Sequence, residues 1–118
     1  MTSKHTVSTF GDAATHAASN TDIPLPKQLA GKIAVVTGST QGLGLATVEL
    51  MLKRGLAGAV ICGRNAEHGN AQAQRLSTDQ QPVVYQQADL SNLDDCRAII
   101  DRAISEFGTL DILINSAG

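Results

Sequence analysis

The chain has 118 residues, of which 42% are hydrophobic, 17% charged and 3% aromatic. This length allows at most one domain, and the apolar fraction is typical of a globular protein rather than a disordered one. The formal net charge is -2, so no basic surface for nucleic acid is expected. No apolar stretch approaches the roughly 18 residues that would cross a bilayer, so we expect no membrane partner either.

The N-terminal segment differs in composition from the rest of the chain. Residues 1–22 are rich in Ser, Thr, Ala and Asn and lack the apolar core of a secretory signal, so we expect a flexible polar tail. Residues 23–31, which include Pro24 and Pro26, are expected to form an extended strap against the domain. The two cysteines, Cys62 and Cys96, form no C-x-x-C pair; we expect them to be reduced and buried in a cytoplasmic protein, and we expect no metal site.

From residue 32 onwards, short apolar runs alternate with helical patterns. The apolar runs predict buried strands over residues 33–36, 59–62, 83–85 and 110–114. Helices are expected between them, over 45–54, over 66–76 after an Asn65 cap, and from a Ser91 cap with Asp94 to Phe107, before Gly108. Strands that alternate with helices predict an α/β fold with a parallel sheet and right-handed crossovers.

A glycine-rich turn joins the first of these strands to the first helix. Between Thr37 and Gly44 the glycines follow the spacing G-x-x-x-G-x-G. Glycines in such a turn let the chain reverse, let the backbone approach a pyrophosphate and let the helix pack closely on the strand. The N-terminus of the helix then offers unpaired N–H groups to the phosphates. The turn lacks the Lys-Ser or Lys-Thr pair of a phosphate-binding loop of the G-x-x-x-x-G-K-S/T kind.

Three motifs in this order resemble those of the short-chain dehydrogenase/reductase family. They are Thr37-Gly38 with Gly42-Leu43-Gly44, Asp89-Leu90 after the third strand, and Asn115-Ser116-Ala117-Gly118 after the fourth. The resemblance covers residues 25–118 and departs from the usual N-N-A-G at Ser116. It implies that residues 23–118 form the N-terminal part of a Rossmann-like, doubly wound NAD(P)-binding domain, incomplete, with the four strands in the order 3-2-1-4 and residues 110–114 at an edge.

The resemblance also implies which residues bind the cofactor. These are Gly38, Ser39, Thr40, Gln41, Gly42, Leu43, Gly44, Arg64, Asn65, Asp89, Leu90, Asn115, Ala117 and Gly118. Two of them have a structural alternative: Asp89 could instead satisfy backbone donors in its own loop, and Asn115 could tie its strand to neighbouring backbone.

The end of the second strand indicates which nicotinamide cofactor is preferred. An acidic residue there would accept hydrogen bonds from the ribose hydroxyls and repel a 2′-phosphate. The sequence has Gly63 at this place, followed by Arg64, whose guanidinium can pair with a phosphate. We therefore expect NADP(H) rather than NAD(H), with a solvated loop cation as the alternative for Arg64.

The resemblance places the catalytic residues elsewhere. In the family a Ser and a Tyr-x-x-x-Lys follow the N-A-G segment, and this sequence stops at Gly118, so no catalytic residue is expected within it. Tyr85 is followed four positions later by Asp89 instead of Lys. We interpret the chain as the N-terminal portion of an enzyme, homo-oligomeric at full length, that transfers a hydride between NADP(H) and an alcohol or carbonyl substrate.

Two alternatives remain. The chain could be a non-catalytic nucleotide-binding fragment with no turnover of its own. An S-adenosylmethionine methyltransferase also has a glycine loop after its first strand, but it normally has an acid where Gly63 and Arg64 stand here.

Overall fold

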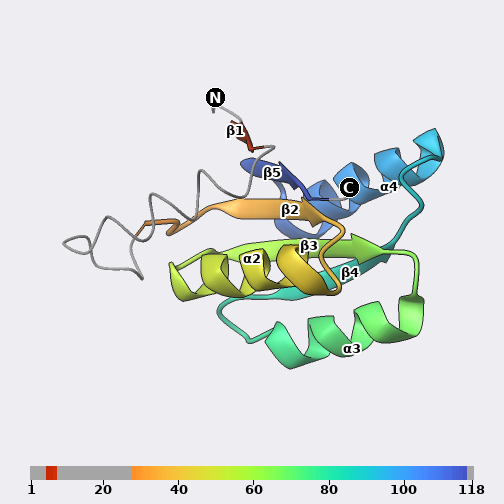
Figure 1. Cartoon of the computed structure of the whole chain (residues 1–118). Coiled ribbons are helices and arrows are strands. Elements are labelled where there is room, and N and C mark those ends of the chain that lie inside the picture. The colour runs from red at the N-terminus through yellow and green to blue at the C-terminus, as the bar shows by residue number, and fades with distance from the viewer. Residues whose placement is uncertain (1–4, 8–27, 117–118) are drawn as a thin grey trace.

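The computed structural model describes residues 5–7 and 28–116, which form a parallel sheet with helices on both faces (Figure 1). Most of the expected tail, and residues 23–27 of the expected strap, lie outside the described residues. The elements in chain order are β1 (His5–Val7), β2 (Ile33–Thr37), α2 (Gly42–Lys53), β3 (Gly58–Gly63), α3 (Ala66–Leu76), β4 (Val83–Gln87), α4 (Leu93–Phe107) and β5 (Ile112–Asn115).

The sheet has the order β1-β5-β2-β3-β4, and every strand pairing in it is parallel. The four strands expected from the sequence therefore lie in the predicted order 3-2-1-4, as β4-β3-β2-β5. The parallel α/β architecture is confirmed. Since the carboxyl ends of parallel strands meet at one edge of a sheet, the turns that follow β2, β3, β4 and β5 lie at the same edge.

The expectation that residues 110–114 form an edge strand is wrong. β5 begins at Ile112, and β1 pairs with it in parallel register, with His5 opposite Ile112 and Val7 opposite Ile114. Residues 5–7 fall within the segment expected to be a flexible tail, and no strand was predicted there. Without β1, the outer edge of β5 would carry unpaired N–H and C=O groups. These groups pair readily with another extended segment, and β1 is that segment.

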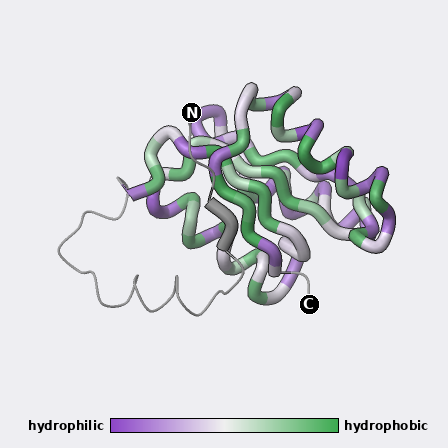
Figure 2. Tube along the Cα trace, turned by 90° about the horizontal axis from the view of Figure 1, so that it is seen from above, coloured by the Kyte–Doolittle hydropathy of each residue, from purple (hydrophilic) through white to green (hydrophobic). Residues whose placement is uncertain are grey.

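Two apolar clusters form the core, one on each face of the sheet. α2 and α3 cover one face, where Ala34 and Val36 belong to the larger cluster, and α4 covers the other face, where Val35 belongs to the smaller one. All five residues of β2 are buried. The continuous apolar run of the sequence therefore reflects a strand that is covered on both sides, and the strands form the hydrophobic centre of the tube in Figure 2.

The helix ends were only partly predicted. Asn65 caps α3 as expected, since its side chain accepts a hydrogen bond from the His68 N–H at 3.0 Å. The expected Ser91 cap of α4 is wrong, because Asn92 caps this helix by accepting from the N–H groups of Asp94 and Asp95. Ser91 is engaged elsewhere: its hydroxyl donates to Asp89 Oδ1 at 2.7 Å.

A glycine in the middle of α3 has a packing role. Glycine at this position weakens the helix by roughly 1 kcal/mol relative to alanine. Gly69 is buried, and a Cβ atom built on it would come within 3.0 Å of the ring of Tyr85 on β4. The Tyr85 hydroxyl in turn donates to the Gly63 carbonyl at 2.5 Å. Gly69 therefore allows α3 to approach the sheet over the Tyr85 ring.

We expect Gly69→Ala to destabilise the chain by about 1–3 kcal/mol in chemical denaturation, because the added methyl overpacks the contact with Tyr85. The control is Asn70→Ala, at an exposed position of the same helix, which is expected to be neutral or slightly stabilising. A stabilisation of Gly69→Ala, as helix propensity alone would give, contradicts this account.

Candidate functional site

The loop after β2 is attached to β3 by a buried serine. The Ser39 hydroxyl donates to the Val36 carbonyl and accepts from the Cys62 N–H at 3.1 Å. The backbone of Ser39 also donates to the Cys62 carbonyl at 3.2 Å. Ser39 has no exposed surface, and its hydrogen bonds hold the start of the glycine loop against the ends of β2 and β3.

The glycines of this loop meet two different requirements. Gly38 and Gly42 have φ angles of 59° and 60°, in the left-handed region that favours glycine. Gly44 is needed for close approach, because a Cβ there would come within 3.0 Å of the Gly38 carbonyl oxygen and of Ser116 Oγ. The N-terminus of α2 consequently lies directly against the loop. The Gln41 side chain makes no capping hydrogen bond, and the first turn contains no acidic residue.

The segment after β5 is tied to the same loop. The Thr37 hydroxyl donates to Asn115 Oδ1 at 2.8 Å and accepts from the Ser116 N–H at 3.1 Å, and the Ser116 hydroxyl donates to the Thr37 carbonyl. Asn115 therefore ties β5 to β2 through the Thr37 side chain, whereas the alternative expected from the sequence was a tie to neighbouring backbone. Sequence reasoning missed Ser116, which it treated only as a departure from N-N-A-G. No sequence pattern indicates that Ser116 lies beside Gly44, because the two residues meet only in the folded structure.

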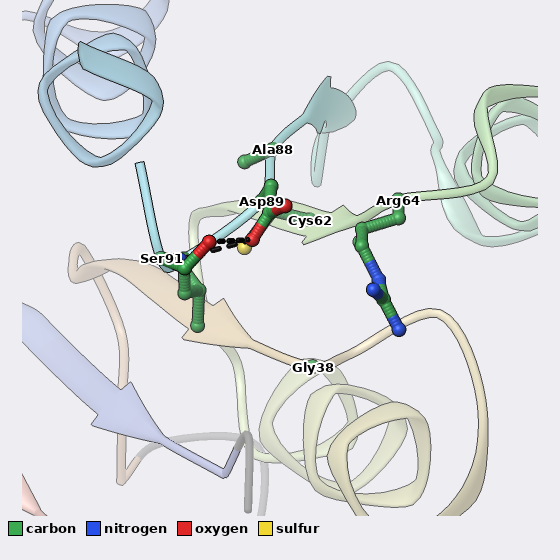
Figure 3. A pocket seen from close by; sticks show the side chains of 8 residues that line it. Gly38, Cys62, Arg64, Ala88, Asp89 and Ser91 are labelled. Atoms are coloured by element: carbon green, nitrogen blue, oxygen red, sulfur yellow. Dashed lines mark hydrogen bonds between the residues drawn. The ribbon is translucent and has the colours of Figure 1, made fainter. Parts of the chain in front are cut away.

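A first cavity, of about 240 Å³, lies between the ends of β2, β3 and β4. Figure 3 shows Asp89 and Ser91 on one side of it and the Arg64 side chain on the other. It is lined by Gly38, Cys62, Gly63, Arg64, Ala88, Asp89, Leu90 and Ser91. Asp89 and Leu90 thus line the same cavity as Gly38 of the glycine loop.

Asp89 satisfies donors of its own loop. Its Oδ1 accepts from the Ser91 hydroxyl at 2.7 Å and from the Ser91 N–H at 3.0 Å, which is the structural role given as its alternative. These hydrogen bonds lower the pKa of the Asp89 carboxyl, because they favour its ionised form. The carboxylate is therefore fixed at the rim of the first cavity.

A second cavity, of about 460 Å³, lies beside the first on the other side of Arg64. The residues that line it all have polar side chains: Thr40, Gln41, Arg64, Asn65 and His68. His68 was not among the expected site residues, and its Nε2 lies 2.7 Å from the Thr40 carbonyl oxygen. Arg64 lines both cavities, so they adjoin at its side chain.

Gly63, which stands where an acidic residue would read the ribose, is packed against Thr40 of the glycine loop. A Cβ built on Gly63 would lie 2.9 Å from Thr40 Oγ1 and 3.2 Å from Thr40 Cγ2. The Thr40 side chain thus occupies the space into which a side chain at residue 63 would project. An acidic side chain there would require Thr40 to move.

Among the described residues, neither the thiols nor the other possible metal ligands form a site of their own. Burial raises the pKa of the Cys62 thiol to about 11, so at neutral pH it is a protonated, unreactive group in the core. Cys62 and Cys96 are both free, but the expectation that both are buried is wrong for Cys96, which is partly exposed on α4. Within residues 5–7 and 28–116, no three His, Cys, Asp or Glu side chains are grouped closely enough to hold a metal ion. No helix in that part of the chain has the length and apolarity needed to cross a membrane.

Most of the expected cofactor-binding residues lie at this sheet edge. Leu43 is 65% exposed on the first turn of α2, and Ser39 is inaccessible behind the loop. Ala117 and Gly118 lie outside the described residues. The remaining ones line the two cavities, lie at the N-terminus of α2, or take part in the hydrogen bonds between Thr37 and the segment after β5.

A glycine loop between a buried strand and a helix, with cavities at the carboxyl edge of a parallel sheet, is the arrangement of a dinucleotide-binding α/β fold. The chain belongs to the short chain dehydrogenase family, whose model matches residues 32–118. A short chain aldehyde dehydrogenase of Euphorbia lathyris is 37% identical over 95 residues, covering 80% of this chain and 32% of the relative. The sex determination protein tasselseed-2 of Zea mays is 41% identical over 96 residues, covering 80% of this chain and 27% of the relative.

A solved structure agrees with these relatives. L-sorbose reductase from Gluconobacter frateurii, complexed with NADPH and L-sorbose, superposes with a TM-score of 0.72 at 31% identity, covering 81% of this chain and 36% of the reductase. The chain therefore spans about a third of the length of the relatives that it matches.

The Asp89 hydrogen bonds predict how the stability of the chain depends on pH. Because the Asp89 pKa is lower in the folded state than the value of about 3.9 in an unfolded chain, its contribution is present at neutral pH and is lost as the pH falls below about 4. We expect the urea midpoint of Asp89→Asn to fall less between about pH 6 and pH 3 than that of the unmodified chain.

The matched control is Asp101→Asn, the same substitution at an exposed position of α4. It should lose as much stability on acidification as the unmodified chain does. An equal acid dependence for Asp89→Asn would contradict a stabilising role of the Asp89 carboxylate.

Proposed function

We propose that this chain forms the NADP(H)-binding part of an oxidoreductase that transfers a hydride between NADP(H) and an alcohol or carbonyl substrate. The observation that carries the proposal is the pair of cavities that adjoin at Arg64, beside the glycine loop and the N-terminus of α2. The nicotinamide ring supplies the hydride chemistry when the cofactor is bound. The residues of the chain bind and orient the cofactor.

Each part of the cofactor has residues suited to hold it. The N–H groups at the start of α2 carry a partial positive charge and suit the pyrophosphate, because no side chain caps them. The first cavity has apolar walls at Ala88 and Leu90 and a fixed carboxylate at Asp89, which suit the adenine. The second cavity, lined by polar side chains, suits a phosphate on the ribose, with Arg64 as a permanently charged cation.

Three observations support NADP(H) over NAD(H). Arg64 offers a guanidinium that can pair with a 2′-phosphate. The space beside Gly63, where an acid would read the ribose hydroxyls, is filled by Thr40. The reductase with which the chain superposes was solved with NADPH.

The alternative is nucleotide binding without turnover by the 118-residue chain. Tyr85 is the single tyrosine of the sequence, its hydroxyl is bound to the Gly63 carbonyl, and Asp89 stands four residues later. We therefore assign no catalytic residue within residues 1–118. Oxidation of NADPH by the purified chain with a panel of aldehydes and ketones would exclude this alternative. The proposal extends to a cytoplasmic location and a homo-oligomeric full-length enzyme.

The cofactor preference is tested by calorimetric titration of the chain with NADP⁺ and NAD⁺. We expect NADP⁺ to bind more tightly, and Arg64→Gln to weaken NADP⁺ binding about tenfold or more, because a charged hydrogen bond to phosphate is lost. NAD⁺ binding should change by less than about twofold in this variant.

The control is Arg97→Gln, which removes the same charge from the exposed side of α4 and should leave both affinities unchanged. The proposal fails if the folded chain binds neither nucleotide. Equal weakening of NADP⁺ and NAD⁺ by Arg64→Gln would overturn the phosphate role of this arginine.

A further inference from the structure

The second cavity contains one titratable side chain for which the proposed function has no role. His68 lies in the first turn of α3 and is half-buried. Its Nε2 lies 2.7 Å from the carbonyl oxygen of Thr40, which belongs to the glycine loop. The imidazole therefore spans from the helix after β3 to the loop after β2, at the cavity that Arg64 also lines.

The contact with Thr40 determines where this imidazole can take up a further proton. A carbonyl oxygen only accepts hydrogen bonds, so Nε2 of His68 carries a proton. Further protonation then occurs at Nδ1 and gives the ring a positive charge without breaking the contact with Thr40. Imidazole is the side chain whose charge ordinarily changes between pH 5 and 8.

A bound phosphate would make the charge around His68 more negative, since the charged groups nearby, Arg64, Glu67 and the Asp89 carboxylate that interacts with Arg64, carry both signs. The cavity itself contributes the Arg64 cation, and Glu67 is the neighbour of His68 on α3. Thr40 and Gln41 of the loop opposite carry no charge. On the other elements packed against α3, Glu49 of α2 is paired with Arg75 at 2.9 Å, and the Tyr85 hydroxyl of β4 is bound to the Gly63 carbonyl.

We propose that His68 is a specificity-determining residue for the 2′-phosphate, and that protonation of His68 and binding of the phosphate strengthen each other. This inference rests on the proposed function, since it requires NADP(H) in the second cavity. A phosphate dianion beside Arg64 adds two negative charges near His68 and so favours the protonated imidazole. Linkage makes the effect reciprocal: the proton strengthens phosphate binding by the same factor.

The test compares the unmodified chain with His68→Gln between about pH 5.5 and pH 8.5. The Gln amide can still donate to the Thr40 carbonyl but cannot be protonated. Dissociation constants for NADP⁺ and NAD⁺ are measured by calorimetry at each pH. Because both proteins meet the same ligand, titration of the phosphate itself cancels in their ratio.

We expect the unmodified chain to bind NADP⁺ about fivefold more tightly than His68→Gln at the acidic end, and equally tightly at the alkaline end. NAD⁺ should bind both proteins equally at every pH. A ratio for NADP⁺ that does not change with pH, or an equal loss for NAD⁺, would show that His68 only holds the loop and would overturn the inference.

A second measurement counts the protons taken up on binding. NADP⁺ binding near pH 7, measured in two buffers that differ in ionisation enthalpy, should take up more protons with the unmodified chain than with His68→Gln, whereas NAD⁺ binding should not differ between them. Equal proton uptake by the two proteins with NADP⁺ would overturn the inference. Failure of the proposed function looks different, because the unmodified chain would then show no preference for NADP⁺ at any pH.

Discussion

The candidate site depends on the burial of β2. All five of its residues are buried, and it pairs along one edge with β3 and along the other with β5. Backbone N–H and C=O groups in an apolar interior must find partners, so β2 holds both neighbours in parallel register along its length. Its parallel pairing brings the glycine loop, the turn at Arg64 and the Thr37 tie to Asn115 together at one edge.

The elements that could be predicted from the sequence are those in which the spacing of apolar residues follows from burial. The apolar runs at 33–36 and 59–62 predicted the two central strands, and the apolar stripe along residues 96–107 predicted α4. β1 could not be found this way, because three residues carry no pattern and their partner lies near the other end of the sequence. The start of α4 was misplaced because Ser91 and Asn92 are both good caps, and the choice depends on Asp89 binding the Ser91 hydroxyl.

The candidate site was predictable where glycine spacing and motif order indicate it. It was not predictable where a common side chain meets the backbone of a distant segment. Ser116 contacts the Thr37 carbonyl 79 residues away, and His68 contacts the Thr40 carbonyl 28 residues away. Nothing in the residue types singles these side chains out, since only the parallel stacking of the strands brings the partners together. The same holds for the packing of Thr40 against Gly63.

The sheet order also constrains how the protein is made. Ile33 at the start of β2 bonds Asp111, 78 residues later, so one edge of the central strand stays unpaired until β5 leaves the ribosome. β3 and β4 are available much earlier on the other edge, and closing the longer loop carries a larger entropic cost. Assembly during synthesis therefore begins on the β3 side of β2. β1 is synthesised before β5, but the two strands can pair only once β5 has been made.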